Sequence, residues 1–383
     1  MVLVWPQPHL AATRVWGSPI AWFIQPLAAV IGGIGVATLY SVAGGSMDPW
    51  AMRHLVRLIA GVALLFGLAL MPAWLWMRVA YPVYGVALLL VAAVLVRGTH
   101  VLGAQRWLVL GPLSLQPSEI MKFALILVLA RLFHELPARK ISSPLALLVP
   151  LAVVALPTVL ILRQPDLGTA GLLAVTGLTL MFLAGLPLRY FVLGASGLAA
   201  AAPFFWALLR DYQKQRLLVF WDPAVDPLGK GYQIEQSKIA LGSGGFVGRG
   251  FLQGTQTQLN FVPEKHTDFV FALWAEETGF IGAAVLIGLY LLLIGCLILL
   301  ALRSRSVFAR LLIGGVATSL FLHMFVNISM VVGLAPVVGV PLPLISYGGT
   351  SLFSLLVGLG IALGVSGQAE DIPRAAYLKR PRA

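Results

Sequence analysis

Long apolar runs recur along almost the whole chain, and they decide the solvent in which it can fold. Hydrophobic residues make up 59% of the 383 residues and charged residues only 10%, whereas soluble domains carry roughly 25% charged residues. Such a chain has too little polar surface to cover a globule in water, so lipid must surround it. This excludes a soluble enzyme and a disordered chain, and the single cysteine, Cys296, excludes a disulfide scaffold.

Ten windows are apolar over the roughly 20 residues that a transmembrane helix needs. We therefore predict an all-α polytopic membrane protein that forms one domain over residues 1–383. The predicted spans are 19–41, 55–72, 79–96, 119–136, 144–162, 168–186, 189–209, 268–302, 309–334 and 350–368.

The distribution of Lys and Arg predicts the orientation of these spans in the cytoplasmic (inner) membrane. With the N-terminus inside, the inner segments hold thirteen such residues and the short outer loops hold five. Because cytoplasmic loops carry the excess of positive charge, both termini are expected in the cytoplasm and the long loop 210–267 outside. Cytoplasmic loops and contact with anionic lipid explain the net charge of +12 without nucleic-acid binding.

Two segments depart from a plain bundle of helices. The loop 210–267 is long, and its aromatic and amphipathic stretches, such as Tyr232–Leu241, predict ordered structure on the outer interface. The segment 336–351 contains three prolines and cannot form a regular helix.

Glu119 and Lys122 are candidate functional residues because charges inside a membrane span are costly. Three positions separate them, so they share one face of the fourth span. We expect a salt-bridged pair near the outer end of this span, with Ser118 as the helix N-cap. Two interpretations stay open: a structural ion pair that holds two helices together, or the polar wall of a substrate cavity.

Asp268 opens the eighth span and is the strongest catalytic candidate. A helix over 268–302 would be about 52 Å long against a hydrocarbon core of about 30 Å, so it must tilt, break or project outward. Asp268 is then expected at or above the outer boundary, with Glu276 and Glu277 close behind. The alternative is that Asp268 caps the helix, and Asp166 has the same alternative at the start of the sixth span.

Histidines do not form a recognisable metal motif. His134, His266 and His323 are scattered along the chain, and none belongs to an HExxH pair. We expect no metal site and no cofactor built into the protein. A divalent cation, Mg²⁺ or Mn²⁺, can still arrive with a phosphorylated substrate.

Many segments together resemble the SEDS family of bacterial membrane proteins, named for shape, elongation, division and sporulation. The resemblance covers about residues 20–368. Its motifs, in the family's order, are 103–107, 116–119 with Lys122, 164–169, Asp222-Pro223, 236–240, 242–245, 263–269, Glu276-Glu277 and 341–351. The segment Leu252–Leu259 and the short termini look more like the elongation branch of the family than the division branch.

The resemblance implies ten transmembrane helices and a peptidoglycan glycosyltransferase. Such proteins polymerise lipid II into β-1,4 glycan strands on the outer face of the cytoplasmic membrane, here during cell elongation and maintenance of rod shape. They work within the elongation machinery, with a class B penicillin-binding protein that supplies the transpeptidase.

The resemblance also carries site residues onto this sequence. The family's essential acid falls on Asp268. The other sensitive positions map onto Arg106, Trp107, Glu119, Lys122, Lys238, Glu264 and Ser351. An inverting displacement needs a base and a stabilised diphosphate leaving group. Asp268 is the expected base, and Lys122, Arg106, Lys238 and Arg210 are candidates for the diphosphate.

Two rival functions are a lipid II flippase and a non-catalytic scaffold. A flippase needs polar groups across the whole membrane thickness, whereas the acids of this chain map to the outer half. For the partner protein, small and aromatic residues of the eighth and ninth spans predict a docking face, for example four residues of the ninth span. These residues are Gly314, Gly315, Ala317 and Phe321.

Overall fold

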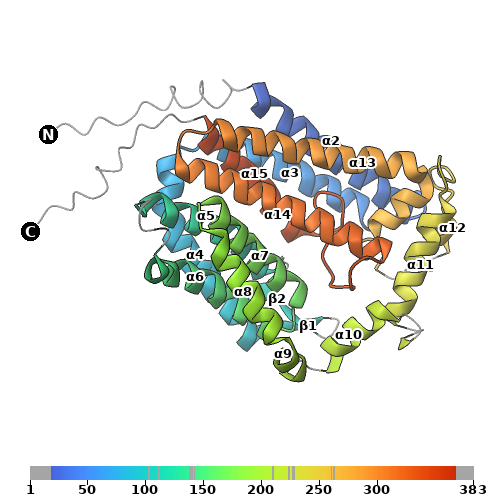
Figure 1. Ribbon diagram of the computed structural model, residues 1–383. Coiled ribbons are helices and arrows are strands. Elements are labelled where there is room, and N and C mark those ends of the chain that lie inside the picture. The colour runs from blue at the N-terminus through green and yellow to red at the C-terminus, as the bar shows by residue number, and fades with distance from the viewer. Residues whose placement is uncertain are drawn as a thin grey trace, which may run out of the picture.

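The computed structural model describes residues 19–101, 104–110, 113–137, 141, 143–208, 211–222, 225–226, 229–259, 261 and 264–367. Figure 1 shows a bundle of helices with a smaller group, α10 to α12, at one side. The helices are α2 (Pro19–Val42), α3 (Ala51–Ala69), α4 (Ala73–Arg97), α5 (Pro117–Glu135), α6 (Pro144–Arg163), α7 (Leu167–Leu183), α8 (Leu188–Ala200), α9 (Ala202–Leu208), α10 (Asp211–Trp221), α11 (Lys230–Ser243), α12 (Thr255–Gln258), α13 (Val270–Arg303), α14 (Val307–Val332) and α15 (Gly349–Ser366).

Each predicted span overlaps a helix of the structure. Seven helices of the described chain are long and apolar enough to cross a membrane: α2, α3, α4, α6, α13, α14 and α15. α7 and α8 are shorter apolar helices, and α5 carries buried charges in its first two turns. The seventh predicted span is divided into α8 and α9. The protein is therefore a multi-pass membrane protein.

A small antiparallel sheet between α4 and α5 was not predicted from the sequence. Its strands are β1 (Thr99–Val101), β2 (Ala104–Leu110) and β3 (Leu113–Leu115), in the order β1-β2-β3. Trp107 pairs with Thr99 on one side, and Leu108 pairs with Leu115 on the other. The sheet holds Arg106 at a fixed place beside the ends of the helices.

The long helix α13 breaks at Gly279, which has a φ of 69°. In a continuous helix the N–H groups of Phe280 and Ile281 would bond the carbonyls of residues 276 and 277. Here they donate instead to the carbonyls of Gly245 and Phe246. A Cβ at Gly279 would collide with the backbone of Gly248, so only glycine allows this approach. The sequence predicted a tilt, a break or a projection, and the structure shows a break.

The carbonyls freed by this break are also satisfied by the long loop. Arg249 N and Gly250 N donate to the carbonyls of Glu276 and Glu277, each at 3.0 Å. The region between α11 and α13 is therefore ordered, as the sequence predicted, and is bonded to the helix that begins just after Asp268.

Prolines inside two helices free carbonyls that side chains of neighbouring helices then bond. Pro157 has no N–H for the carbonyl of Val153, and the hydroxyl of Tyr84 in α4 donates to that oxygen at 2.8 Å. Pro82 likewise has no N–H for the carbonyl of Arg78. Nη1 of Arg131 in α5 lies 3.3 Å from that carbonyl oxygen. These bonds tie α4, α5 and α6 together.

The connection between α14 and α15, residues 333–348, is irregular, as its prolines predicted. It lies across the ends of several helices. Ser346 Oγ donates to the carbonyl of Thr267 at 2.5 Å, and Tyr347 N donates to the carbonyl of His266 at 2.9 Å. A Cβ at Gly168, in the first turn of α7, would lie 2.8 Å from the carbonyl oxygen of Val338. This α14–α15 loop joins the starts of α7, α13 and α15.

Candidate active site

Asp268 lies in a turn immediately before α13, not in the helix. The N–H groups of Thr267 and Asp268 both donate to the carbonyl of Glu264, at 3.1 and 3.2 Å. The N-cap position of α13 is Phe269, and no side chain caps it. The alternative in which Asp268 serves as the helix N-cap is therefore wrong. Its side chain is half-buried, at the end of the bundle where the α14–α15 loop lies.

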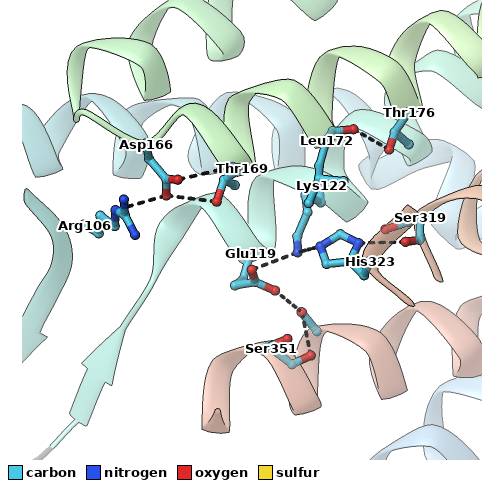
Figure 2. Close-up of polar contacts among 11 residues, drawn as sticks. Arg106, Glu119, Lys122, Asp166, Thr169, Leu172, Thr176, Ser319, His323 and Ser351 are labelled. Atoms are coloured by element: carbon cyan, nitrogen blue, oxygen red, sulfur yellow. Dashed lines mark hydrogen bonds and ion pairs between the residues drawn. The ribbon is translucent and has the colours of Figure 1, made fainter. Parts of the chain in front are cut away.

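Asp166 does cap its helix and is also bound to a cation. Its Oδ1 accepts the backbone N–H of Thr169 at 3.2 Å, which makes it the N-cap of α7. Its Oδ2 lies 3.3 Å from Nε of Arg106, at an angle that leaves this N–H without a hydrogen bond. Nη2 of Arg106 donates to the carbonyl of Pro165 at 3.4 Å. The capping alternative was correct for Asp166, and the ion pair fixes the guanidinium of Arg106 (Figure 2).

Gly339 of the α14–α15 loop brings Arg106 and Asp268 into one place. A Cβ built on Gly339 would lie 3.4 Å from Oδ2 of Asp268 and 3.8 Å from Nη1 of Arg106. These two atoms are therefore at most 7.2 Å apart, the sum of the two distances. A carboxylate from the turn before α13 and a guanidinium from β2 thus border the same space.

A second group of polar residues is buried between α5, α14 and α15. Nζ of Lys122 lies 2.8 Å from Oε1 of Glu119 and 2.6 Å from Nε2 of His323 (Figure 2). All three side chains are almost fully buried. The predicted salt bridge is present. The predicted N-cap is wrong, because Gln116 occupies that position and Ser118 is buried within the first turn of α5.

The hydrogen bonds fix the protonation of His323. Nδ1 of His323 lies 2.7 Å from the carbonyl oxygen of Ser319, which can only accept, so Nδ1 carries the proton. Nε2 then has a free lone pair for the ammonium of Lys122. The histidine is neutral and completes the shell of Lys122, because a buried cation needs acceptors on its N–H groups.

A small cavity of about 10 Å³ opens beside this group, close to the space that one water molecule needs. Ser351, in the first turn of α15, lines it together with Glu119, Lys122 and His323. Ser354 Oγ lies 3.2 Å from Oε2 of Glu119 and 3.0 Å from the carbonyl of Ser351. The structural interpretation fits these contacts, because the ion pair joins α5 to α14 and α15. The substrate-cavity interpretation stays a prediction.

Three other predicted site residues have contacts of their own: Lys238 and Trp107 point elsewhere, and Glu264 belongs to the turn that holds Asp268. Nζ of Lys238 in α11 would lie 2.8 Å from a Cβ on Gly333, the C-cap of α14, where its charge faces the carbonyl end of that helix. Trp107 follows Arg106 on β2, so the two side chains point to opposite faces. Glu264 accepts the hydroxyl of Thr267 at 3.1 Å within the turn. Arg210 lies outside the described residues.

Glu276 and Glu277 hold the long loop in place. Oε1 of Glu276 accepts the N–H of Gln256 at 2.8 Å and the hydroxyl of Thr255 at 3.1 Å. Glu277 accepts the hydroxyl of Ser41 at the end of α2. These two acids therefore position the loop rather than join Asp268 in one acidic cluster.

The predicted docking face on α14 is largely wrong. A Cβ on Gly314 would lie 3.2 Å from Leu183 of α7, and one on Gly315 would lie 2.6 Å from Ile126 of α5. Ala317 is buried. The small residues thus pack inside the bundle, and of the four only Phe321 is exposed, where it stacks on Phe325.

His323 and Asn327 are the residues that the sequence analysis missed. They are four positions apart and so lie on one face of α14. Nδ2 of Asn327 donates to the carbonyl of Asp268 at 2.9 Å and to that of Val340 at 2.7 Å. One helix face thus contacts both polar groups. The available signal was this pair of polar residues at helical spacing in an apolar span.

His266, two residues before Asp268, sits in an aromatic stack outside the spans. Its ring lies 4.8 Å from that of Trp50 and 6.0 Å from that of Tyr347, measured between centroids. Burial lowers the pKa of His266, and the neighbouring Lys265 lowers it further, while Glu264 raises it. The uncharged ring is therefore the form that this stack favours.

Among the described residues, no group of three or more His, Cys, Asp or Glu side chains is placed to hold a metal ion. Of the cationic side chains at these two groups, Arg106 is partly exposed and lies beside Asp166, whereas the ammonium of Lys122 is buried and bonded to Glu119.

Known proteins with similar sequences and structures identify the family. Residues 20–371 match the family model of FtsW, RodA and SpoVE, described as cell cycle proteins. The peptidoglycan glycosyltransferase MrdB of Escherichia coli strain K12 is 44% identical over 316 residues, which cover 82% of this chain and 84% of that protein. The probable peptidoglycan glycosyltransferase FtsW of Coxiella burnetii is 38% identical over 325 residues, covering 84% and 87%.

Two solved structures have the same fold. One comes from work on structural coordination of polymerization and crosslinking by a peptidoglycan synthase complex; its TM-score is 0.79 at 37% identity, with 90% of this chain and 97% of that chain covered. The crystal structure of the rod shape determining protein RodA of Thermus thermophilus has a TM-score of 0.68 at 33% identity, covering 90% and 96%. The chain belongs to the FtsW, RodA and SpoVE family, the SEDS family that its motifs resemble.

Proposed function

We propose that this chain polymerises lipid II into β-1,4 glycan strands during cell elongation, with Asp268 as the general base. It is a peptidoglycan glycosyltransferase of the rod-shape type, the activity named for its 44% identical relative. The observation that carries the mechanism is the placement of Asp268 and Arg106 about one space, no more than 7.2 Å apart. A base and a cation around one space are what a displacement with an anionic leaving group needs.

The reaction is a single displacement at the anomeric carbon. The 4-hydroxyl oxygen of the acceptor sugar attacks C1 of the donor, and its proton passes to the carboxylate of Asp268. The bond from C1 to the diphosphate oxygen breaks, and that oxygen keeps the electron pair. Arg106, anchored by Asp166 at 3.3 Å, is positioned to stabilise the departing diphosphate. The α-linked donor gives a β-linked product because one displacement inverts the carbon.

Lys122 has a different role from that of a free diphosphate cation. Its ammonium is buried and already bonded to Glu119 and His323. We infer that it fixes the start of α5 near α15, where Glu119 contacts Ser354, and that it lines a cavity of the size of one water molecule. Five other residues remain candidates for contacts with the substrate. They are Lys238, Glu264, Trp107, Ser351 and Arg210. A divalent cation, Mg²⁺ or Mn²⁺, would enter with the substrate diphosphate.

We infer that this site lies on the outer face of the membrane, with both termini in the cytoplasm. The buried charged residues of the described chain support this orientation, because they gather near one end of the bundle. They lie in the first eight residues of α5 and α13 or at the N-cap of α7, and are Glu119, Lys122, Asp166, Glu276 and Glu277. A flippase would need charges through the other half of the thickness as well, so polymerisation is favoured over transport.

The partner that we propose is a class B penicillin-binding protein, which crosslinks the strands. Support comes from the similar structure, whose subject is a synthase complex that coordinates polymerization and crosslinking.

The experiment uses the purified full chain with lipid II, alone and with such a partner, and scores glycan strands on a gel. We expect polyprenyl-diphosphate release and strands, with more product when the partner is present. A chain that moves lipid II across vesicle membranes and makes no strands under either condition would contradict the proposal.

A further inference from the structure

Gly339 stands at the point where the two charged groups of the proposed site face each other. Its φ is +72°, in the left-handed region that favours glycine. Yet the space around its missing side chain is not filled by protein backbone: the near atoms are Oδ2 of Asp268 at 3.4 Å and Nη1 of Arg106 at 3.8 Å. A methyl group would fit there without a collision, so packing alone does not demand glycine.

The space beside Gly339 is narrow. Oδ2 of Asp268 and Nη1 of Arg106, the two atoms that border it, are at most 7.2 Å apart. An added carbon between them would occupy room that the reacting atoms need.

Contacts on both neighbours of Gly339 fix its position, so the space cannot easily widen. The next residue, Val340, accepts from the amide of Asn327, which also holds the carbonyl of Asp268. The preceding residue, Val338, lies against Gly168 in the first turn of α7, two residues from the Asp166 that anchors Arg106. The same two contacts therefore position the glycine, the base and the cation relative to one another.

We propose that Gly339 is a positioning residue that keeps open the place of the anomeric carbon between Asp268 and Arg106. This inference rests on the proposed glycosyl transfer. It adds a residue that neither accepts a proton nor stabilises a charge in that reaction. The α14–α15 loop then forms one wall of the space in which the sugar reacts.

The test compares Gly339→Ala with the same change at a control glycine that also has a positive φ. Gly185 has a φ of +99°, and a Cβ there would meet nothing within 4 Å. Both alanine variants place a side chain at a positive φ and therefore carry backbone strain. With lipid II, we expect Gly339→Ala to lose about 100-fold in kcat while KM changes less than about threefold, because the lipid tail and the peptide bind elsewhere. Gly185→Ala should polymerise like the wild type.

A third variant, Gly339→Asn, separates the effect of backbone strain from that of the volume that the side chain occupies. Asn tolerates the left-handed region better than Ala, but its side chain is larger. If backbone strain alone mattered, Gly339→Asn would be more active than Gly339→Ala; the inference expects it to be no more active. A Gly339→Ala protein that polymerises at the rate of Gly185→Ala, or an Asn variant that recovers activity, would overturn the inference. In that case the proposed function is judged separately: it still holds if the wild type makes glycan strands and Asp268→Asn does not.

Discussion

Nε2 of His323 lies 2.6 Å from Nζ of Lys122, although 201 positions separate these residues in the chain. The contact joins α14 to α5 at the centre of the bundle. A neutral imidazole can satisfy an ammonium in this way without adding charge. It makes Lys122 the shared member of a buried network with Glu119, and changes at the three residues should therefore not be independent.

His323 should tolerate a replacement only if an acceptor remains. His323→Gln offers a carbonyl oxygen to Lys122, whereas His323→Leu leaves one of its N–H groups without a partner. We expect the Leu variant to be less stable by about 1–3 kcal/mol and the Gln variant to fall in between. Thermal unfolding of the detergent-purified proteins measures this. Equal melting temperatures for the two variants would show that the contact with Lys122 contributes nothing.

Glu119 and Lys122 should be less tolerant of single than of double changes. Glu119→Gln or Lys122→Met alone leaves one buried charge without its partner, at a cost of about 3–5 kcal/mol. The double variant removes both charges and should be more stable than either single variant, with some polymerisation retained. If each single variant unfolds at the wild-type temperature, the two residues do not act as a buried pair.

Tyr84 should matter only because Pro157 frees a carbonyl. Tyr84→Phe removes the bond to the oxygen of Val153 and should lower stability by about 1 kcal/mol. In a Pro157→Ala background the helix regains its own N–H donor for that oxygen, so Tyr84→Phe should cost less there. The four proteins form a double-mutant cycle. Additive effects would mean that the proline and the tyrosine are not linked in this way.

His266 should give the protein a pH-dependent stability. Its pKa is lowered in the folded protein, so the unfolded chain takes up the proton first. The stability that it contributes is complete above the ordinary histidine pKa of about 6.5 and is lost as pH falls below it. We expect the melting temperature to fall between pH 7 and pH 5, and to fall less in His266→Phe, which keeps a ring beside Trp50. Parallel curves for the two proteins would contradict this.

Helix positions were predictable from the sequence because apolar length alone marks a membrane span. The excess length of α13 predicted a tilt, a break or a projection. It did not predict a break at Gly279, since the loop that bonds the break lies some 30 residues earlier in the chain. The strand β2 was missed because seven residues between two apolar spans carry no distinct period. The ion pair of Glu119 and Lys122 was predictable because helical spacing brings the two residues together.

Contacts between distant elements were not predictable in this way. His323 and Asn327 share one face of an apolar helix, but the partner of His323 is not known until α5 is packed against that helix. Gly339 lies in a segment whose prolines exclude a helix but say nothing of its neighbours. The space that it shares with Arg106 and Asp268 depends on how β2, α13 and the α14–α15 loop meet.

The central claim, that Asp268 is the base, is tested most directly by the rate at which Asp268→Asn polymerises lipid II. Asn keeps the shape of the side chain and leaves the backbone carbonyl free to accept from Asn327, but it cannot take a proton. We expect a folded, membrane-inserted protein whose rate of strand formation is lower by about 10²–10⁴-fold, with Asp268→Ala equally inactive. An Asp268→Asn protein that makes glycan strands at close to the wild-type rate would contradict the account.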